Sequence, residues 1–203
     1  MHFLMGLWKR IVITIWEKLV SLTKKDTADT KSSPTMNEVL IYGSTENKEE
    51  KKQAGLKNLF CILYTIVHAG ETIDVSIPSL ESDSLTKSLI QVKRKNNVQV
   101  RCIVYKSPDF YNLRCLSDNG VCVKVINSTV ELEHEFIIID GYGCDSIVIL
   151  GSIDFEVKRV NCCKDITILS SDSALIVPLR REFERVWLSV DDSNINKFDN
   201  VDE

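Results

Sequence analysis

The alternation of strand-like and helix-like segments is the feature that most constrains how this chain can fold. Short runs of apolar and β-branched residues predict strands at 38–42, 72–77, 98–105 and 121–126, two more within 131–155, and another at 165–170. Longer segments with apolar residues at helical spacing predict helices at 51–70, 82–97 and 172–187. This order predicts an α/β fold in which helices flank a mixed, largely parallel sheet.

A single domain of this kind accounts for most of the 203 residues. We expect it to span residues 37–190. Residues 23–36 contain no large apolar residue before Met36, which predicts a linker. Residues 191–203 are polar and acidic, which is typical of a disordered tail.

Residues 1–22 predict an amphipathic helix, because at helical spacing one face collects the apolar side chains Leu4, Leu7, Trp8, Ile11, Val12, Ile15 and Leu19. The longest uncharged interior run, residues 11–16, is far shorter than the roughly 20 apolar residues that cross a bilayer. Such a helix can lie in a membrane surface through residues 3–22, or can dock on its own domain or on a partner. Both interpretations stay open.

The charge and the cysteines restrict the function further. A formal charge of −4 argues against a surface that is basic throughout, so a phosphate-bearing partner would have to be bound locally. The seven cysteines include no C-x-x-C pair and no histidine at ligand spacing. We therefore predict reduced thiols in a reducing compartment, with no bound metal and no cofactor.

Residues 133–155 carry the pattern with the most chemical content. Four apolar residues precede Asp140, and a second apolar strand ends at Gly151 and Ser152. With the later segment P-L-R-R-E-F-E-R-V-W at 178–187, this pattern resembles the phospholipase D superfamily. The resemblance covers the predicted domain from its first strand to its last helix. It is greatest to the single-motif branch that contains the mitochondrial cardiolipin hydrolases, or Zucchini-type piRNA endonucleases.

The family signature is His-x-Lys, four residues and Asp, followed later by Gly-Ser. This sequence matches it at Asp140, Gly151 and Ser152 and departs from it at Glu133, Glu135 and Asp165. Asp165 follows Lys164 at a position where the family usually carries Glu. Glu133 and Glu135 stand at the His and Lys positions.

The resemblance implies that the family histidine attacks phosphorus, that the lysine holds the phosphate oxygens, and that the motifs of two subunits face each other. Glu133 and Glu135 can perform neither role. A carboxylate about 4 Å from a phosphate charge repels it by about 4 kcal/mol at an effective dielectric near 20. We therefore predict a catalytically degenerate member that acts in binding or scaffolding. By resemblance it would serve piRNA biogenesis on the cytosolic face of the mitochondrial outer membrane.

His134 lies between the two glutamates and is the residue that could rescue catalysis. Side chains alternate along a strand, so His134 points away from a site into which Glu133 and Glu135 point. One alternative is an active phosphodiesterase, an RNA endonuclease or cardiolipin hydrolase, with a rebuilt site that uses Glu135 or His134 as acid or base. Another is a regulatory heterodimer with an active paralogue, in place of a homodimer.

Basic residues offer a candidate surface for single-stranded RNA or anionic lipid. They are Lys93, Arg94, Lys95, Arg101, Lys106, Lys158, Arg159 and Lys164. The competing interpretation is that residues 93–95 form a solvated helix end and that the other charges are scattered over the surface.

Overall fold

The computed structural model describes residues 35–42, 47–96, 98–105, 110–126, 132–151 and 165–190. Its elements are β1 (Asn37–Tyr42), α2 (Lys48–Val67), β2 (Thr72–Ile77), α3 (Asp83–Asn96), β3 (Gln99–Val104), α4 (Phe110–Asp118), β4 (Cys122–Val125), β5 (Phe136–Ile139), β6 (Ile147–Gly151), β7 (Asp165–Ser170) and α5 (Ser173–Ser189). The predicted N-terminal helix, residues 1–34 in general and the tail from residue 191 lie outside the described residues.

The seven strands form one mixed sheet in the order β1-β7-β6-β5-β2-β3-β4. Parallel pairing is confined to β2–β3 and β3–β4. The other four pairings are antiparallel. The predicted α/β class and mixed sheet are confirmed, but the expectation of a largely parallel sheet is wrong. The second half of the chain folds as antiparallel neighbours, which need no helical crossover.

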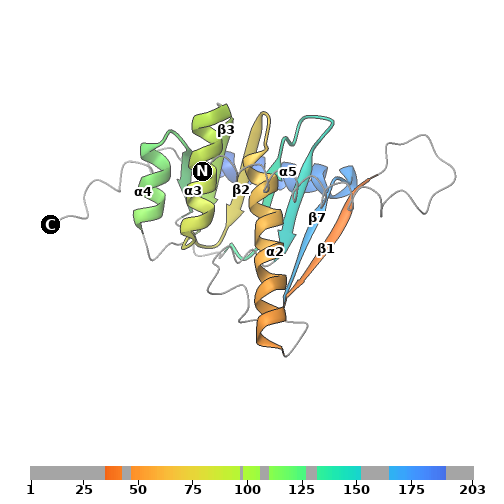
Figure 1. The fold of residues 1–203 in the computed structure, drawn as a ribbon. Coiled ribbons are helices and arrows are strands. Elements are labelled where there is room, and N and C mark those ends of the chain that lie inside the picture. Colours follow the sequence, from red (N-terminus) through yellow and green to blue (C-terminus); the bar gives the residue numbers. More distant parts are fainter. Residues whose placement is uncertain are drawn as a thin grey trace. The chain divides into compact units, whose positions relative to one another are not determined.

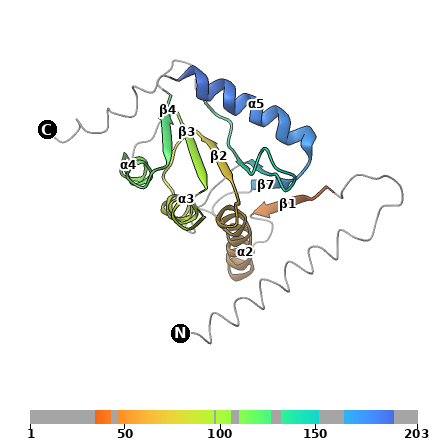
Figure 2. The same cartoon turned by 90° about the horizontal axis from the view of Figure 1, so that it is seen from above.

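The helices lie on both faces of the sheet (Figure 1). α2, α3 and α4 cover one face and α5 crosses the other (Figure 2). α4 connects the parallel strands β3 and β4 and was not predicted from the sequence. A parallel pair requires such a crossover, so the two predicted strands at 98–105 and 121–126 already implied an element between them.

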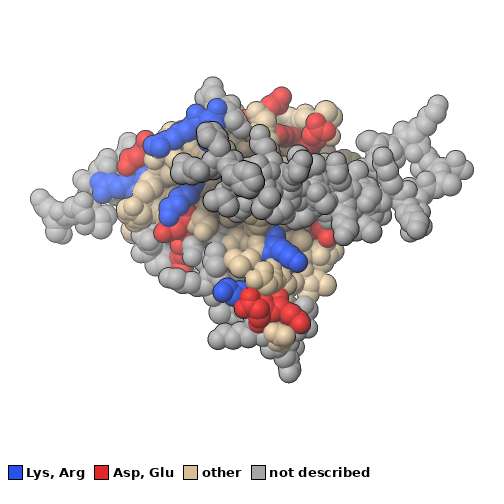
Figure 3. Space-filling view, in the orientation of Figure 1, with Lys and Arg blue, Asp and Glu red and all other residues tan. Residues whose placement is uncertain are grey.

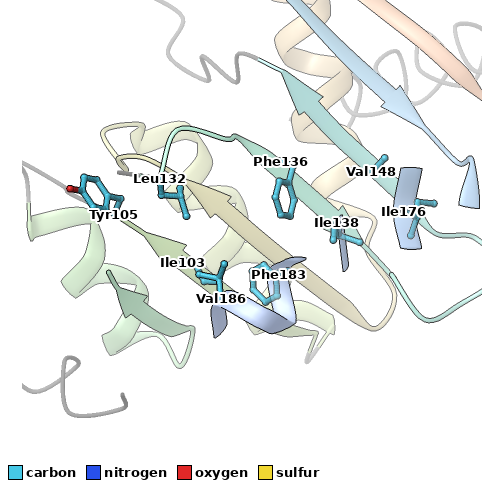
Figure 4. Close-up of a cluster of buried hydrophobic side chains, with 9 residues drawn as sticks. All are labelled: Ile103, Tyr105, Leu132, Phe136, Ile138, Val148, Ile176, Phe183 and Val186. Atoms are coloured by element: carbon cyan, nitrogen blue, oxygen red, sulfur yellow. The ribbon is translucent and has the colours of Figure 1, made fainter. Parts of the chain in front are cut away.

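Side chains from β5 and α5 build the core on the face that α5 covers. Phe136 and Ile138 of β5 pack in one cluster with Phe183 and Val186 of α5 (Figure 4). The alternate residue Ile137 is also fully buried, and it faces the helices on the other side. This double burial explains why β5 reads as a continuous apolar run.

The two ends of α5 are fixed by polar contacts. Asp172 caps the start by accepting a hydrogen bond from the Ala174 backbone N–H at 2.8 Å. At the far end Lys124 of β4 donates to the carbonyl oxygens of Trp187 and Val190, at 3.1 and 2.8 Å. A cation at the carboxyl end of a helix also complements the helix dipole. Pro178, whose place was ambiguous in the sequence, lies inside this helix.

None of the helices in the described ranges is both long enough and apolar enough to cross a bilayer.

Candidate functional site

The strands define two ends of the sheet, and the candidate residues divide between them. We call the end where β2, β3 and β4 finish and β5 begins the motif end. Ser76, next to the last residue of β2, pairs there with Phe136. We call the other end, where Ile73 pairs with Ile139, the opposite end. In α/β sheets ligands bind beyond the carboxyl ends of the parallel strands, which is the motif end here.

Glu135 and Gly151 meet at the motif end, and Glu133 precedes Glu135 by two residues. The backbone N–H of Gly151 donates to the Glu135 carbonyl oxygen at 3.3 Å. Gly151 has φ +112°, and a Cβ there would lie 2.6 Å from the Ile166 carbonyl oxygen, so no other residue fits. Glu133 is exposed and Glu135 is half-buried. Leu132 belongs to the core under α5, so alternation directs Glu133 toward the face of α2 and α3.

His134 lies on the α5 face, away from the acidic pair. Its Nδ1 is 3.3 Å from the Ser76 hydroxyl oxygen, and its Nε2 is 3.6 Å from Oε1 of Glu182. The ring also packs against Phe136, with centroids 5.2 Å apart. Two hydrogen bonds from Arg185 lower the pKa of Glu182. The sequence pattern predicted the direction of His134 but not Ser76 and Glu182, which are far away along the chain.

Asp140 lies at the opposite end, a full strand away from Glu135. Its carboxylate accepts hydrogen bonds from the backbone N–H groups of Gly70, Glu71 and Thr72, at 2.8, 2.7 and 2.9 Å. Asp140 itself has φ +51°, a left-handed conformation that aspartate tolerates better than most residues. The motif aspartate therefore ties the turn after β5 to the turn before β2, and it does not touch the acidic pair.

A partly buried charge network lies near Asp140, on the α5 face. Arg101 of β3 donates to both carboxylate oxygens of Asp74, at 2.7 and 2.8 Å, and to Glu184 of α5 at 2.6 Å. The Tyr142 hydroxyl donates to the same Glu184 at 2.9 Å. The Arg101 guanidinium also lies 4.8 Å from the Phe183 ring centre. Burial raises the pKa of Asp74, which the bonds from Arg101 oppose, whereas the bond from Arg101 lowers the pKa of Glu184.

The structure describes only part of the predicted basic surface, and Lys106 lies outside the described residues. Arg101 belongs to the internal network, so its assignment to an exposed face is corrected. Lys93, Arg94 and Lys95 close α3 at the opposite end, away from the acidic pair. Figure 3 has a group of basic side chains over that end of α3. Ser152, Lys158, Arg159 and Lys164 lie outside the described residues. Asp165 begins β7 opposite Tyr42, at the motif end.

Within the described ranges, no group of three or more His, Cys, Asp and Glu side chains is placed to hold a metal ion.

The mixed sheet, the helix across its second face and the Gly151 turn beside residues 133–135 define a phospholipase D-like α/β domain. The family described as "Cardiolipin synthase, PLD-like domain" matches residues 62–187, and the chain belongs to this family. It is 25% identical to a mitochondrial cardiolipin hydrolase of Xenopus laevis over 68% of this chain. It is 22% identical to one of Danio rerio over 66% of this chain. The matched region spans 64% of the Xenopus protein and 59% of the Danio protein.

Two solved structures share the fold. Nuc of Salmonella typhimurium, a phospholipase D family member, superposes with a TM-score of 0.60 at 14% identity, over 77% of this chain and 97% of that one. NucT of Helicobacter pylori superposes with a TM-score of 0.59 at 15% identity, over 77% of this chain and 98% of that one. The resemblance to the phospholipase D superfamily inferred from the sequence is thereby confirmed.

Proposed function

We propose that this chain is a catalytically degenerate phospholipase D-like protein that acts in binding or scaffolding. The observation that carries the proposal is the acidic pair, Glu133 and Glu135, at the motif end of the sheet. The family resemblance assigns these two positions to an attacking imidazole and an ammonium group. Neither a carboxylate nor a carboxylic acid can replace a cationic clamp on a phosphate whose charge grows in the transition state.

The position of His134 also supports the proposal. A histidine that replaced the missing nucleophile would have to reach the face of the sheet on which the acidic pair lies. His134 instead contacts Ser76 and approaches Glu182, and its ring packs on Phe136. Turning it to the other face would require a one-residue slip of β5, which would take Phe136 out of the core under α5 and turn Glu133 and Glu135 onto the α5 face.

We extend the proposal to a place and a process. The similar Xenopus and Danio proteins are named mitochondrial cardiolipin hydrolases, which supports an association of this chain with mitochondria. We propose the cytosolic face of the outer membrane, with residues 3–22 on the lipid surface, and a role in piRNA biogenesis. Single-stranded RNA and anionic lipid are the two ligand classes to test. Fluorescence imaging of the tagged full chain, with and without residues 1–22, tests the location.

Activity assays on the full chain test the loss of catalysis. We expect no hydrolysis of single-stranded RNA or of cardiolipin vesicles by the wild type. The double variant E133H/E135K restores the family pair. We expect its hydrolysis rate to exceed the background rate by at least about a hundredfold, the lower end of what a positioned acid or base contributes. The matched control E133Q/E135Q removes the negative charge without supplying a nucleophile and should gain nothing.

Turnover by the wild type that Glu135→Gln abolishes would refute the proposal. If that turnover also required an added divalent metal ion, the rebuilt phosphodiesterase site would be the correct reading, because the parent chemistry uses no metal.

A second candidate function is regulation of an active paralogue in a heterodimer. The exposed carboxylate of Glu133 favours it, because two acidic motif ends facing each other in a homodimer would repel. An acidic motif end facing a partner's His and Lys would instead form favourable pairs. Co-purification with an intact single-motif relative tests this candidate. We expect the charge reversal E133K/E135K to weaken the complex, and an unchanged complex would count against it.

A further inference from the structure

An uncovered apolar strip lies along one edge of the sheet. Val39 and Ile41 of β1 and Ile166 of β7 are 52, 55 and 49% exposed. Ile41 pairs with Ile166, and Val39 pairs with Ile168, so these side chains share one face. Ile168 in turn pairs with Leu150, which packs against the core under α5. We call Val39, Ile41 and Ile166 the β1 strip; it lies on the α5 face, beyond the part that α5 covers.

Within the part of the chain that the structure describes, the strand that carries the strip lacks the usual protection of a sheet edge. Edge strands are normally blunted by short length, lysine, proline or a bulge. β1 has six residues in unbroken register with β7, no proline and no lysine, and Glu38 is its one charged residue. β4, at the other edge, has four residues. On β1 the Asn58 side chain donates to the Ile41 carbonyl oxygen at 3.1 Å, so this carbonyl points away from β7. By the alternation of an antiparallel ladder, the backbone groups of Val39 point the same way, whereas those of Glu38 and Leu40 face β7.

We propose that the β1 edge is a self-association surface at which a second copy of this chain adds its own β1 in antiparallel register. A two-fold axis perpendicular to the sheet keeps the same face upward in both copies, as a closed symmetric dimer requires. The two β1 strips then join into one continuous apolar face. The backbone groups of both edges become paired at the same time, as in other cases of strand addition.

The sequence of β1 is compatible with its own copy. In a register centred on Val39, that residue lies opposite the partner's Val39, and Glu38 lies opposite the partner's Leu40. No like charges face each other across the pair, and apolar side chains meet on the face of the strip. A foreign strand could use the same edge, but only a second copy is guaranteed to bring a matching strip.

This surface is separate from the motif end and does not depend on the proposed function. β7 and β6 stand between β1 and β5 in the sheet, so pairing at the edge leaves Glu133 accessible. The interface is small. A standard interface buries about 800 Å² per partner. A short ladder and three half-exposed side chains bury less than that. We therefore expect a reversible, concentration-dependent dimer.

Sedimentation of the full chain over a wide concentration range tests the proposal. We expect the wild type to shift toward dimer as the concentration rises. Val39→Lys places a natural edge-blocking residue in the strip and should raise the dimer dissociation constant by at least about tenfold. The control Leu188→Lys changes a residue that is 79% exposed on α5 and should leave the constant unchanged. The thermal midpoint of each variant confirms that it is folded.

Hydrogen exchange of the Val39 amide provides a second readout. We expect protection at high concentration, lost on dilution and in Val39→Lys. A monomer at every concentration overturns the proposal, and so does a dimer that is unaffected by Val39→Lys. A dimer that dissociates only in E133K/E135K lies at the motif end and overturns this proposal without affecting the proposed function. If the Val39 amide stayed protected in the monomer, the chain's own residues would occupy the β1 edge. This result would also overturn the proposal.

Discussion

Among the described residues, the two ends of β5 differ in the kind of contacts that their side chains make. At the opposite end Asp140 accepts three backbone hydrogen bonds, and the network of Asp74, Arg101, Glu184 and Tyr142 joins β2, β3, α5 and the turn after β5. At the motif end Glu133 is exposed. The same four-residue strand therefore connects an end held by several side-chain hydrogen bonds to an end that carries an exposed carboxylate.

If the motif is altered as proposed, this difference explains how the chain can keep the fold of its family. The motif aspartate acts in structure, because its partners are backbone groups of a neighbouring turn. Replacing a catalytic pair at the motif end removes none of these bonds. Stability and catalysis are therefore separable here, and substitutions at the two ends should differ in their cost.

Removing Arg101 should have the largest effect. Arg101→Ala leaves the buried carboxylate of Asp74, with a side chain only 2% exposed, without its bidentate partner. Breaking a buried pair in this way costs about 3–5 kcal/mol. Chemical denaturation at neutral pH measures the loss. Arg181→Ala, at an exposed position of the same helix that carries Glu184, should stay within about 0.5 kcal/mol. A loss below about 1 kcal/mol for Arg101→Ala would mean that the network contributes little.

Removing the Asp140 carboxylate should cost less. Asp140→Ala deprives three backbone N–H groups of their acceptor, but Gly70 and Glu71 are exposed enough for water to replace part of it. We expect a loss of about 1–3 kcal/mol in the free energy of unfolding. Asp140→Asn keeps one acceptor oxygen and should fall between the wild type and the alanine variant. Equal stability of all three proteins would contradict the structural role of this aspartate.

Acid should weaken the opposite end in a way that depends on Glu184. The Arg101 bond lowers the pKa of Glu184 in the folded state. The contribution of Glu184 to the free energy of unfolding is therefore fully present above the glutamate pKa of the unfolded chain, near 4.3. It is lost as the pH falls through the lower pKa of the folded state. Burial raises the pKa of Asp74, so the effect of its titration on stability has the opposite sign. Glu184→Gln should flatten the fall in unfolding free energy below about pH 5. An unchanged acid slope, measured by denaturation at several pH values, would contradict this assignment.

The sequence predicted most of the strands because their apolar runs are continuous. The strands at 72–77 and 165–170 have the predicted bounds. It missed α4, a helix of nine residues, and it overestimated parallel pairing. Strand direction is set by which neighbours pair, and the antiparallel partners β1 and β7 are separated by more than a hundred residues. Local patterns carry no such information.

The candidate site was predictable only in part. The structure places His134 on the α5 face, beside Ser76 and Glu182, as alternation predicted for this one residue. The partners of Asp140 and Arg101 could not be predicted. Gly70 precedes Asp140 by 70 residues, and Glu184 follows Arg101 by 83. A basic residue on a strand resembles a surface charge until the carboxylates that surround it are known.

The smallest effect should come from the motif end itself. Glu133→Gln removes one charge from an exposed side chain. Solvent and salt screen the interactions of such a charge with other charges. We expect the free energy of unfolding to change by no more than about 0.5 kcal/mol, against several times that for Arg101→Ala. The two variants, measured side by side in the same denaturant, test the separation of the two ends directly. If Glu133→Gln destabilised the protein as much as Asp140→Ala, the acidic pair would be part of the folding architecture, and its presence would then need no functional explanation.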